Sequence, residues 1–254
     1  MEGMARGLKA VADLILPRTC IVCGRKLLLD EKHICLFCLA DMPQTRHWTM
    51  KHNPMADRFN AVIQKGLEAA WDEYGVEKVG TERYVYATAL FFYDMDAGYR
   101  HIPYHVKYHG DRAAGKHFGK MLGKRLSYAP WLKDVDAVVP VPLHWFRRWE
   151  RGYNQAEIIA EGVTEIIDAP LRTDILKRIR YTRTQTKLDI RSKAQNVEGA
   201  FLCKQHRGNG LRHILLIDDV FTTGATLYAC YAALRSVFPS SVRISIATLG
   251  FVGD

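Results

Sequence analysis

The stretch that decides the fold is ILLIDDVFTTGATL, residues Ile214 to Leu227. Four apolar residues that run directly into two acids are typical of a strand buried on both faces as it leaves a parallel sheet. Asp218 and Asp219 are therefore predicted at the carboxyl end of that strand, which is the edge where open α/β sheets bind ligands. The short turn that follows consists of Thr222, Thr223, Gly224, Ala225 and Thr226.

This turn leads into a predicted helix. A helix N-terminus with threonine hydroxyls and close backbone N–H groups is suited to a phosphate, and neighbouring carboxylates can hold hydroxyls or a metal ion. The acids and the turn together predict a sugar phosphate as the ligand. The alternative is a purely structural arrangement of a buried strand, an acidic turn and an N-capped helix.

The stretch resembles the phosphoribosyl pyrophosphate (PRPP) signature of type I phosphoribosyltransferases, and every position of that pattern is filled. The resemblance implies that Asp218 and Asp219 are the catalytic acids that hold the ribose 2′ and 3′ hydroxyls. It also implies that the turn from Thr222 to Thr226 wraps the 5′-phosphate. PRPP, bound together with Mg²⁺, is the ligand that follows.

A second motif lies near the N-terminus, where two C-x-x-C pairs are separated by eleven residues: Cys20 and Cys23, then Cys35 and Cys38. Two such pairs that face each other form a tetrahedral four-cysteine site for Zn²⁺. The site is expected to be structural, because four thiolates leave no open position for chemistry. Two alternatives remain: a pair of disulfides, or replacement of one thiolate by His33.

The totals describe a globular chain of 254 residues, of which 48% are hydrophobic and 25% charged. No apolar run approaches the length of a membrane span, and residues 1–16 lack the apolar core and cleavage site of a signal peptide. We therefore expect a cytoplasmic protein without membrane insertion. The formal charge of +9 indicates a polyanionic partner or anionic substrates. Cys203 and Cys230 are interpreted as buried small apolar residues.

The order of patterns predicts three parts: an N-terminal helix and zinc ribbon (1–42), a connector or insertion with one helix (43–83), and an α/β domain (84–254). Strands are expected at 84–94, 136–143 and 241–250, the last as a parallel or edge strand, and residues 200–204 are expected to return to the sheet. Alternating strands and helices predict a doubly wound parallel sheet. The segment 144–155 is interpreted as a loop that brings three arginines together with Trp145, Phe146 and Trp149.

Taken together, these parts resemble the ComF family of late competence proteins, in which a short zinc ribbon precedes a type I phosphoribosyltransferase-like domain. The matching pieces are CIVC…CLFC, VKYHGD, VVPVPL, RWERGYNQAEIIA, TRTQTKLDIRSKAQNVEGAF and ILLIDDVFTTGAT. One departure is Lys193, where the family usually shows arginine, so the charge stays but the bidentate geometry is lost.

The resemblance also implies roles for two further segments. Val141 and Pro142 are implied to bind pyrophosphate, with Arg151 as the cationic partner. The alternative is that the arginines of this segment belong to a solvated cationic loop. The loop that closes over PRPP corresponds to the basic segment 178–197, with Arg183, Gln185, Lys187, Lys193 and Asn196.

The function that the resemblance implies is DNA uptake in natural competence, with single-stranded DNA and a helicase-like protein as partners. Physically, a basic loop and an Arg/Trp cluster can follow a phosphate backbone and stack on bases. The zinc ribbon serves either as a structural cap or as a contact to DNA or protein. Two alternatives stay open: an active phosphoribosyltransferase of nucleotide metabolism with an unidentified acceptor, and a PRPP-sensing regulator without turnover.

Overall fold

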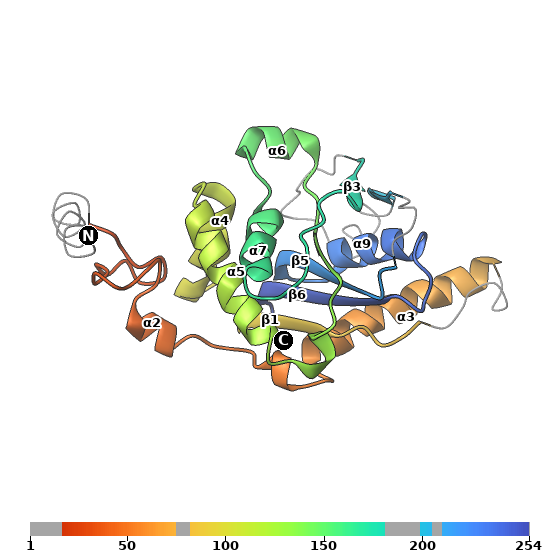
Figure 1. The fold of residues 1–254 in the computed structure, drawn as a ribbon, viewed down its shortest axis with the longest axis horizontal. Coiled ribbons are helices and arrows are strands. Elements are labelled where there is room, and N and C mark those ends of the chain that lie inside the picture. The colour runs from red at the N-terminus through yellow and green to blue at the C-terminus, as the bar shows by residue number, and fades with distance from the viewer. Residues whose placement is uncertain (1–16, 75–81, 181–198, 205–209, 254) are drawn as a thin grey trace.

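A four-stranded parallel sheet forms the centre of the protein, as seen in a computed structural model that describes residues 17–74, 82–180, 199–204 and 210–253 (Figure 1). Its order is β1 (Ala87–Phe92), β6 (Arg243–Phe251), β5 (His213–Phe221) and β2 (Ala137–Pro140). The predicted α/β fold with a parallel sheet is confirmed. The strand predicted at 241–250 is β6, which pairs with both β1 and β5 and therefore lies inside the sheet rather than at its edge.

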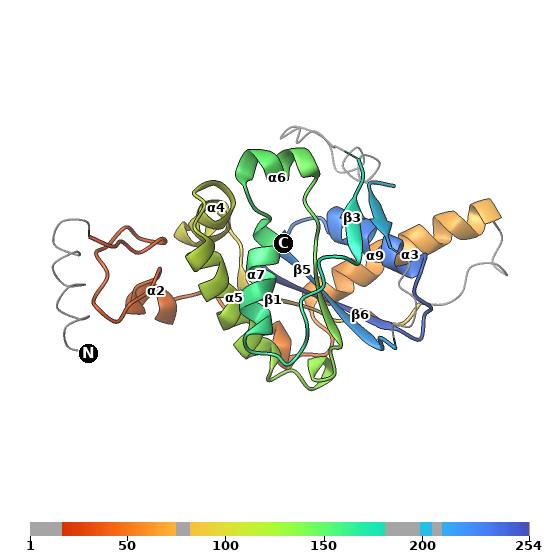
Figure 2. The ribbon, with the colours of Figure 1, turned by 45° about the horizontal axis from the view of Figure 1, so that its top comes forward.

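Helices cover both faces of this sheet, as expected for a doubly wound fold. One face carries α3 (Pro54–Tyr74) and α9 (Ala225–Arg235); the other carries α4 (His101–Tyr108), α5 (Arg112–Leu126) and α7 (Gln155–Thr164) (Figures 1 and 2). Successive residues of β5 alternate between the two cores, because side chains of a strand point to opposite faces in turn. Ile214 and Leu216 enter the α3/α9 core, and Leu215 and Ile217 enter the other.

Tight helix packing holds α5 and α7 together. A Cβ atom on Gly119 would lie 2.2 Å from the carbonyl oxygen of Ile159. On Gly162, it would lie 2.3 Å from the carbonyl oxygen of Lys116. Only glycine permits so close an approach of two backbones.

The segment predicted as a connector contributes directly to the core. Its helix α3 places Met55, Phe59 and Ile63 against the sheet, and Asn53 caps the N-terminal end by accepting from the Ala56 N–H (3.0 Å). The boundaries proposed between the three parts stay a prediction.

Two expectations for the chain after β2 were wrong. The segment interpreted as a loop contains a short helix, α6 (Trp145–Arg151), whose first turn is capped by His144 Nδ1. The segment at 200–204 does not return to the main sheet. It forms β4 (Phe201–Cys203), which pairs antiparallel with β3 (Leu176–Arg178) in a separate two-stranded sheet.

The cysteine-rich segment lies at one end of the molecule, beyond α4 and α5 (Figures 1 and 2). This segment includes α2 (Leu36–Ala40). Later in the chain, short 3₁₀ turns occur at His47–Thr49, Gly98–Arg100 and Pro130–Leu132. The hydroxyl of Tyr99 donates to the Cys38 carbonyl (2.9 Å), and the His33 ring pairs with Asp111 at the start of α5 (3.6 Å). The N-terminal helix predicted within residues 1–16 lies outside the described residues. Among the described helices, none is both long and apolar enough to cross a membrane.

Candidate functional site

The two acids of the opening stretch lie where β2 stops pairing with β5. In the pairing of β2 with β5, the last pair is Pro140 opposite Ile217. Asp218 and Asp219 follow Ile217 immediately, so they lie just beyond the carboxyl end of this pairing. Both carboxylates are buried. Because they are consecutive in a strand, they point to opposite faces of the sheet: Asp218 towards α9 and Asp219 towards α4. The sequence predicts both acids at this edge, but it does not predict that they face different neighbours.

Asp218 lies in an environment that disfavours its charged form. Burial and the neighbouring Asp219 carboxylate raise the pKa of Asp218 to about 8. Its Oδ1 accepts one hydrogen bond from the Asp219 backbone N–H (2.9 Å). At neutral pH the Asp218 carboxyl is therefore mostly protonated, and it can release a proton when a cation or a hydrogen-bond donor binds.

Asp219 has a cationic partner that sequence reasoning missed. Lys107, at the end of α4, lies 3.7 Å from Asp219 Oδ2. The carboxylate raises the pKa of Lys107, so the ammonium of this partly exposed side chain stays charged at neutral pH. The available signal was the VKYHGD piece of the family pattern, in which Lys107 stands just before the turn into α5.

The threonine turn has the local structure that the sequence predicts. Gly224 adopts φ +79°, in the left-handed region, and caps the N-terminus of α9. A Cβ atom there would lie 2.9 Å from the Phe221 ring, so both conformation and space require glycine. Thr223 Oγ1 accepts from the Ala225 N–H (3.4 Å), and Thr222 is exposed. The turn and the acids therefore adjoin at one end of β5.

A cleft of about 410 Å³ opens next to Asp219, between α4 and α6. Its lining residues are Lys107, Tyr108, Gly110, Glu150, Arg151 and Tyr153. The guanidinium of Arg151 lies over the Tyr108 ring (5.2 Å to the centroid) and donates to Gln155 Oε1 (3.3 Å). The structure thus brings the predicted Arg151 together with Lys107 at one cleft.

Tyr153 fixes one wall of this cleft. Its hydroxyl donates to the Val106 carbonyl (2.6 Å) and accepts from the Gly110 N–H (3.1 Å), which joins the end of α4 to the segment after α6. Like Lys107, Tyr108 and Glu150, it was not among the residues selected from the sequence.

The other two residues predicted to bind pyrophosphate have no backbone N–H to offer. The Val141 N–H already donates to the Ile217 carbonyl (2.8 Å), and the Val141 carbonyl accepts from Asn154 Nδ2 (3.0 Å). Pro142, like any proline, has no backbone N–H. The residues selected for the closing loop, Arg183, Gln185, Lys187, Lys193 and Asn196, lie outside the described residues.

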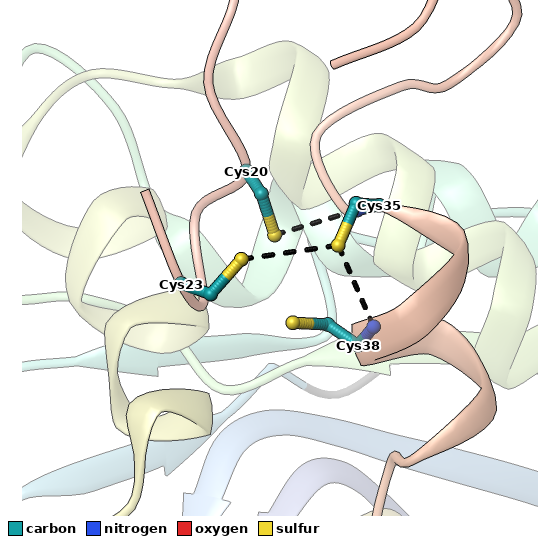
Figure 3. A group of neighbouring side chains, drawn as sticks. All are labelled: Cys20, Cys23, Cys35 and Cys38. Carbon is teal, nitrogen blue, oxygen red and sulfur yellow. Dashed lines mark hydrogen bonds between the residues drawn. The ribbon is translucent and has the colours of Figure 1, made fainter. Parts of the chain in front are cut away.

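The four predicted cysteine ligands converge at the other end of the molecule (Figure 3). Their sulfurs all lie within 4.8 Å of one another, and the Sγ atoms of Cys23 and Cys35 are 3.8 Å apart. Four sulfurs placed tetrahedrally about 2.3 Å from a zinc ion are about 3.8 Å apart, so the cluster fits this metal. The Cys35 N–H donates to Cys20 Sγ (3.3 Å), which orients one ligand of each pair.

Both alternatives for this cluster fail. All six cysteines lie in the described part of the chain and are free, so no disulfide forms. The His33 ring pairs with Asp111, the N-cap residue of α5, and is half-buried, rather than joining the sulfurs or lying exposed in a loop. A hydrogen bond from the Arg25 backbone lowers the pKa of Cys23 to about 7, whereas burial raises the pKa of Cys38. Metal binding requires the thiolate form of each ligand. The four cysteines can therefore hold a structural zinc ion. The two cysteines outside the cluster, Cys203 and Cys230, are buried as predicted.

A serine–histidine–aspartate set occurs away from the cleft but has no access to a substrate. His213 Nε2 lies 2.8 Å from Ser245 Oγ, and its Nδ1 lies 3.2 Å from Asp134 Oδ1. Ser245 and His213 are fully buried at the amino ends of β6 and β5. The set therefore ties the two central strands together and does not act as a nucleophile.

No model of a known protein family matches the chain. A solved structure of "the allosteric regulatory enzyme of purine biosynthesis" is similar at 23% identity and a TM-score of 0.35, over 53% of this chain and 25% of that chain. A likeness at this score carries no conclusion.

Curated relatives match more clearly. Competence protein F of Haemophilus influenzae is 37% identical over 114 residues, 44% of this chain and 50% of its own length. DNA utilization protein YhgH of Escherichia coli K12 is 33% identical over 38% of this chain and 41% of its own length. Competence protein ComFC of Bacillus subtilis is 37% identical over 36% of this chain and 35% of its own length. The chain spans half or less of the length of these relatives. Their names and identities of 33–37% support the assignment of this chain to the ComF family.

Proposed function

We propose that this chain binds PRPP with Mg²⁺ at the carboxyl end of β5 and acts in DNA uptake. The observation that carries the proposal is the combination at this edge: two buried acids, a left-handed glycine turn into α9, and a cleft lined by Lys107 and Arg151. Acids suit the ribose hydroxyls, helix N–H groups suit a phosphate, and the two cations suit a pyrophosphate.

Each part of PRPP has a proposed place. The 5′-phosphate lies on Thr222 to Thr226, where the first N–H groups of α9 and the threonine hydroxyls donate to it. The ribose hydroxyls bind Asp218 and Asp219. Pyrophosphate lies in the cleft, where the Arg151 fork and the Lys107 ammonium neutralise its charge.

Magnesium fits the donor set of this site. Mg²⁺ in proteins is typically held by one or two carboxylates together with substrate phosphate oxygens, and Asp218 and Asp219 supply the carboxylates. When bound, the ion neutralises the pyrophosphate and so helps it to leave. The protein's own residues position the ligand and stabilise the positive charge that develops on the ribose as pyrophosphate departs.

Calorimetry of PRPP binding in the presence of Mg²⁺ tests the site. The double variant Asp218→Asn/Asp219→Asn is expected to lose binding, whereas Asp174→Asn, a half-exposed acid paired with Arg172, is expected to retain it. Unchanged affinity of the double variant would refute the assignment. Because Asp218 is mostly protonated at neutral pH, binding at pH 7 should release a proton, and the apparent enthalpy should then vary with the ionisation enthalpy of the buffer.

The biological part of the proposal rests on the relatives named for competence and DNA utilization. In cells that take up DNA, loss of this protein is expected to lower transformation, and a helicase-like protein is the proposed partner. Complementation with the wild-type chain should restore transformation, whereas the variant without PRPP binding should not. Restoration by that variant would separate the PRPP site from DNA uptake.

Phosphoribosyl transfer is a second candidate, favoured by the size of the cleft. About 410 Å³ is within the range of small-ligand pockets, and Tyr108 provides an aromatic wall. Incubation of the protein with Mg²⁺, PRPP and candidate acceptors, with and without single-stranded DNA, should release pyrophosphate if transfer occurs. Binding without release under all these conditions would instead indicate a PRPP sensor.

A further inference from the structure

The short helix α6 exposes an unusual concentration of aromatic surface. Trp149 is 79% exposed, Trp145 is 70% exposed and Phe146 is 40% exposed. Tryptophan is highly buried on average in folded proteins, so two adjacent exposed indoles call for a ligand. In both views α6 lies at the rim of the molecule, joined to β2 and α7 by two connecting segments (Figures 1 and 2).

The three rings lie close enough to form one surface, which we call the α6 aromatic surface. The ring centroids of Trp145 and Phe146 are 5.9 Å apart, and those of Phe146 and Trp149 are 6.3 Å apart. Trp145 and Trp149 are four residues apart on the helix, so they lie on the same side, one turn apart (about 6 Å along the axis).

Positive charge accompanies these rings. The helix carries three arginines and one glutamate, in the sequence WFRRWER. Burial, followed by the charge of Arg147, lowers the pKa of Arg178 on β3. Arg148 pairs with Glu157 of α7 (3.3 Å), as Lys116 and Lys120 of α5 pair with Glu165, so two glutamates, Glu150 and Glu157, accompany the three arginines. An excess of cations therefore accompanies the exposed aromatic rings on α6.

We propose that the α6 aromatic surface binds single-stranded nucleic acid, with bases stacked on Trp145 and Trp149 and the phosphates drawn to the adjacent arginines. Unpaired bases offer flat faces to stack on, and their backbone supplies the charge that complements the cations of α6. A double helix keeps its bases stacked inside and should bind less well. This proposal rests on the proposed role in DNA uptake and adds the site of contact.

The position of α6 links this surface to the cleft. Glu150 and Arg151, the last two residues of the helix, line the cleft, whereas the exposed rings of Trp145 and Trp149 do not. A strand bound on α6 would therefore lie beside the proposed PRPP site without filling it. Loss of the tryptophans should weaken nucleic-acid binding and leave PRPP binding intact.

The test is a titration of the full chain with a fluorescently labelled oligodeoxythymidylate at moderate salt, read by anisotropy. Trp145→Ala and Trp149→Ala should each weaken binding at least about fivefold, since base stacking on one aromatic side chain contributes about 1–3 kcal/mol, where 1.4 kcal/mol is tenfold in affinity. The matched control is Tyr128→Ala, an aromatic residue that follows α5 and is 59% exposed.

The outcomes separate this proposal from the PRPP assignment. Weaker oligonucleotide binding by the tryptophan variants, with PRPP binding unchanged in calorimetry, supports the α6 site whether or not PRPP is the cleft's ligand. Equal binding by the wild type and the Trp145→Ala/Trp149→Ala double variant would overturn it, as would a loss seen only with Tyr128→Ala. Co-sedimentation with anionic phosphatidylserine vesicles that requires both tryptophans, without oligonucleotide binding, would assign the surface to lipid instead.

Discussion

The substitution Asp218→Asn is predicted to stabilise the free protein while it removes PRPP binding. Asparagine has almost the same shape, and its carbonyl oxygen can still accept from the Asp219 N–H, as Asp218 Oδ1 does. It has no charged form, so the penalty of ionising a buried group next to a second carboxylate disappears. A residue held in an unfavourable state for the sake of a ligand is typical of functional sites.

The magnitude follows from the displaced pKa. In the folded protein the pKa of Asp218 rises from its ordinary 3.8 to about 8, and each unit corresponds to about 1.4 kcal/mol. The full displacement from 3.8 to about 8 corresponds to about 6 kcal/mol, which is the upper bound of the effect because a second carboxylate shares the site.

The sign sets the pH window. A folded pKa above the unfolded one means that the native state holds a proton that the unfolded state has released, so stability falls as pH rises from about 4 to about 8. The advantage of Asp218→Asn should therefore be absent near pH 4, grow across this range and level off above pH 8.

Urea unfolding at a series of pH values, with zinc held constant, measures this difference. Asp174→Asn serves as the control, because it removes a half-exposed acid that pairs with Arg172 and should give a small, pH-independent change. A destabilised Asp218→Asn, or a difference that does not vary with pH, would refute the reasoning. Asp219→Asn should instead lower the free energy of unfolding, because it leaves the Lys107 ammonium without its carboxylate partner. The loss should be smaller than the ~3–5 kcal/mol that follows when one partner of a fully buried pair is removed.

Three further predictions concern the rest of the fold. Burial lowers the pKa of His213 and His47 to about 4, so the unfolded state binds more protons between about pH 4 and 6.5, and the urea midpoint should fall as pH drops through this window. Gly119→Ala should destabilise by about 1–3 kcal/mol through a clash with α7, whereas Gly253→Ala, whose Cβ would have only ordinary contacts, should be near neutral in the same assay. Atomic absorption should find one zinc per chain, and its removal by a chelator should speed hydrogen exchange in residues 17–40 but not in β5; equal protection with and without zinc would contradict a structural role.

The sequence was sufficient where chemistry depends on close spacing. The strand, the acids and the glycine turn are contiguous, and the spacing of the C-x-x-C pairs determines how their ligands meet, so the sequence predicts both local arrangements. The position of β6 inside the sheet could not be predicted in this way, because strand order depends on packing between distant segments. The helix α6 was missed because its tryptophans and arginines point largely to solvent and leave no apolar periodicity.

The partnership of Lys107 with Asp219 shows a different limit. The two residues are far apart in the chain, and no local pattern predicts that the end of α4 reaches the end of β5. The opposite directions of the two acids, in contrast, follow from the alternation of any strand and were available from the sequence. What the sequence lacked was the set of neighbours on each face, and the neighbours of Asp218 raise its pKa.

Those neighbours also determine how the proposed ligands affect each other. Arg151 belongs to α6 and at the same time lines the proposed pyrophosphate cleft. If a bound strand draws Arg151 towards a phosphate of its own, the cleft loses a cation, and PRPP should bind more weakly in the presence of oligonucleotide. Thermodynamic linkage then requires PRPP to weaken oligonucleotide binding by the same factor. Arg151→Gln should remove this mutual effect, whereas Arg148→Gln, whose guanidinium pairs with Glu157 instead, should preserve it. A mutual effect that persists in Arg151→Gln would show that the two sites communicate through another route.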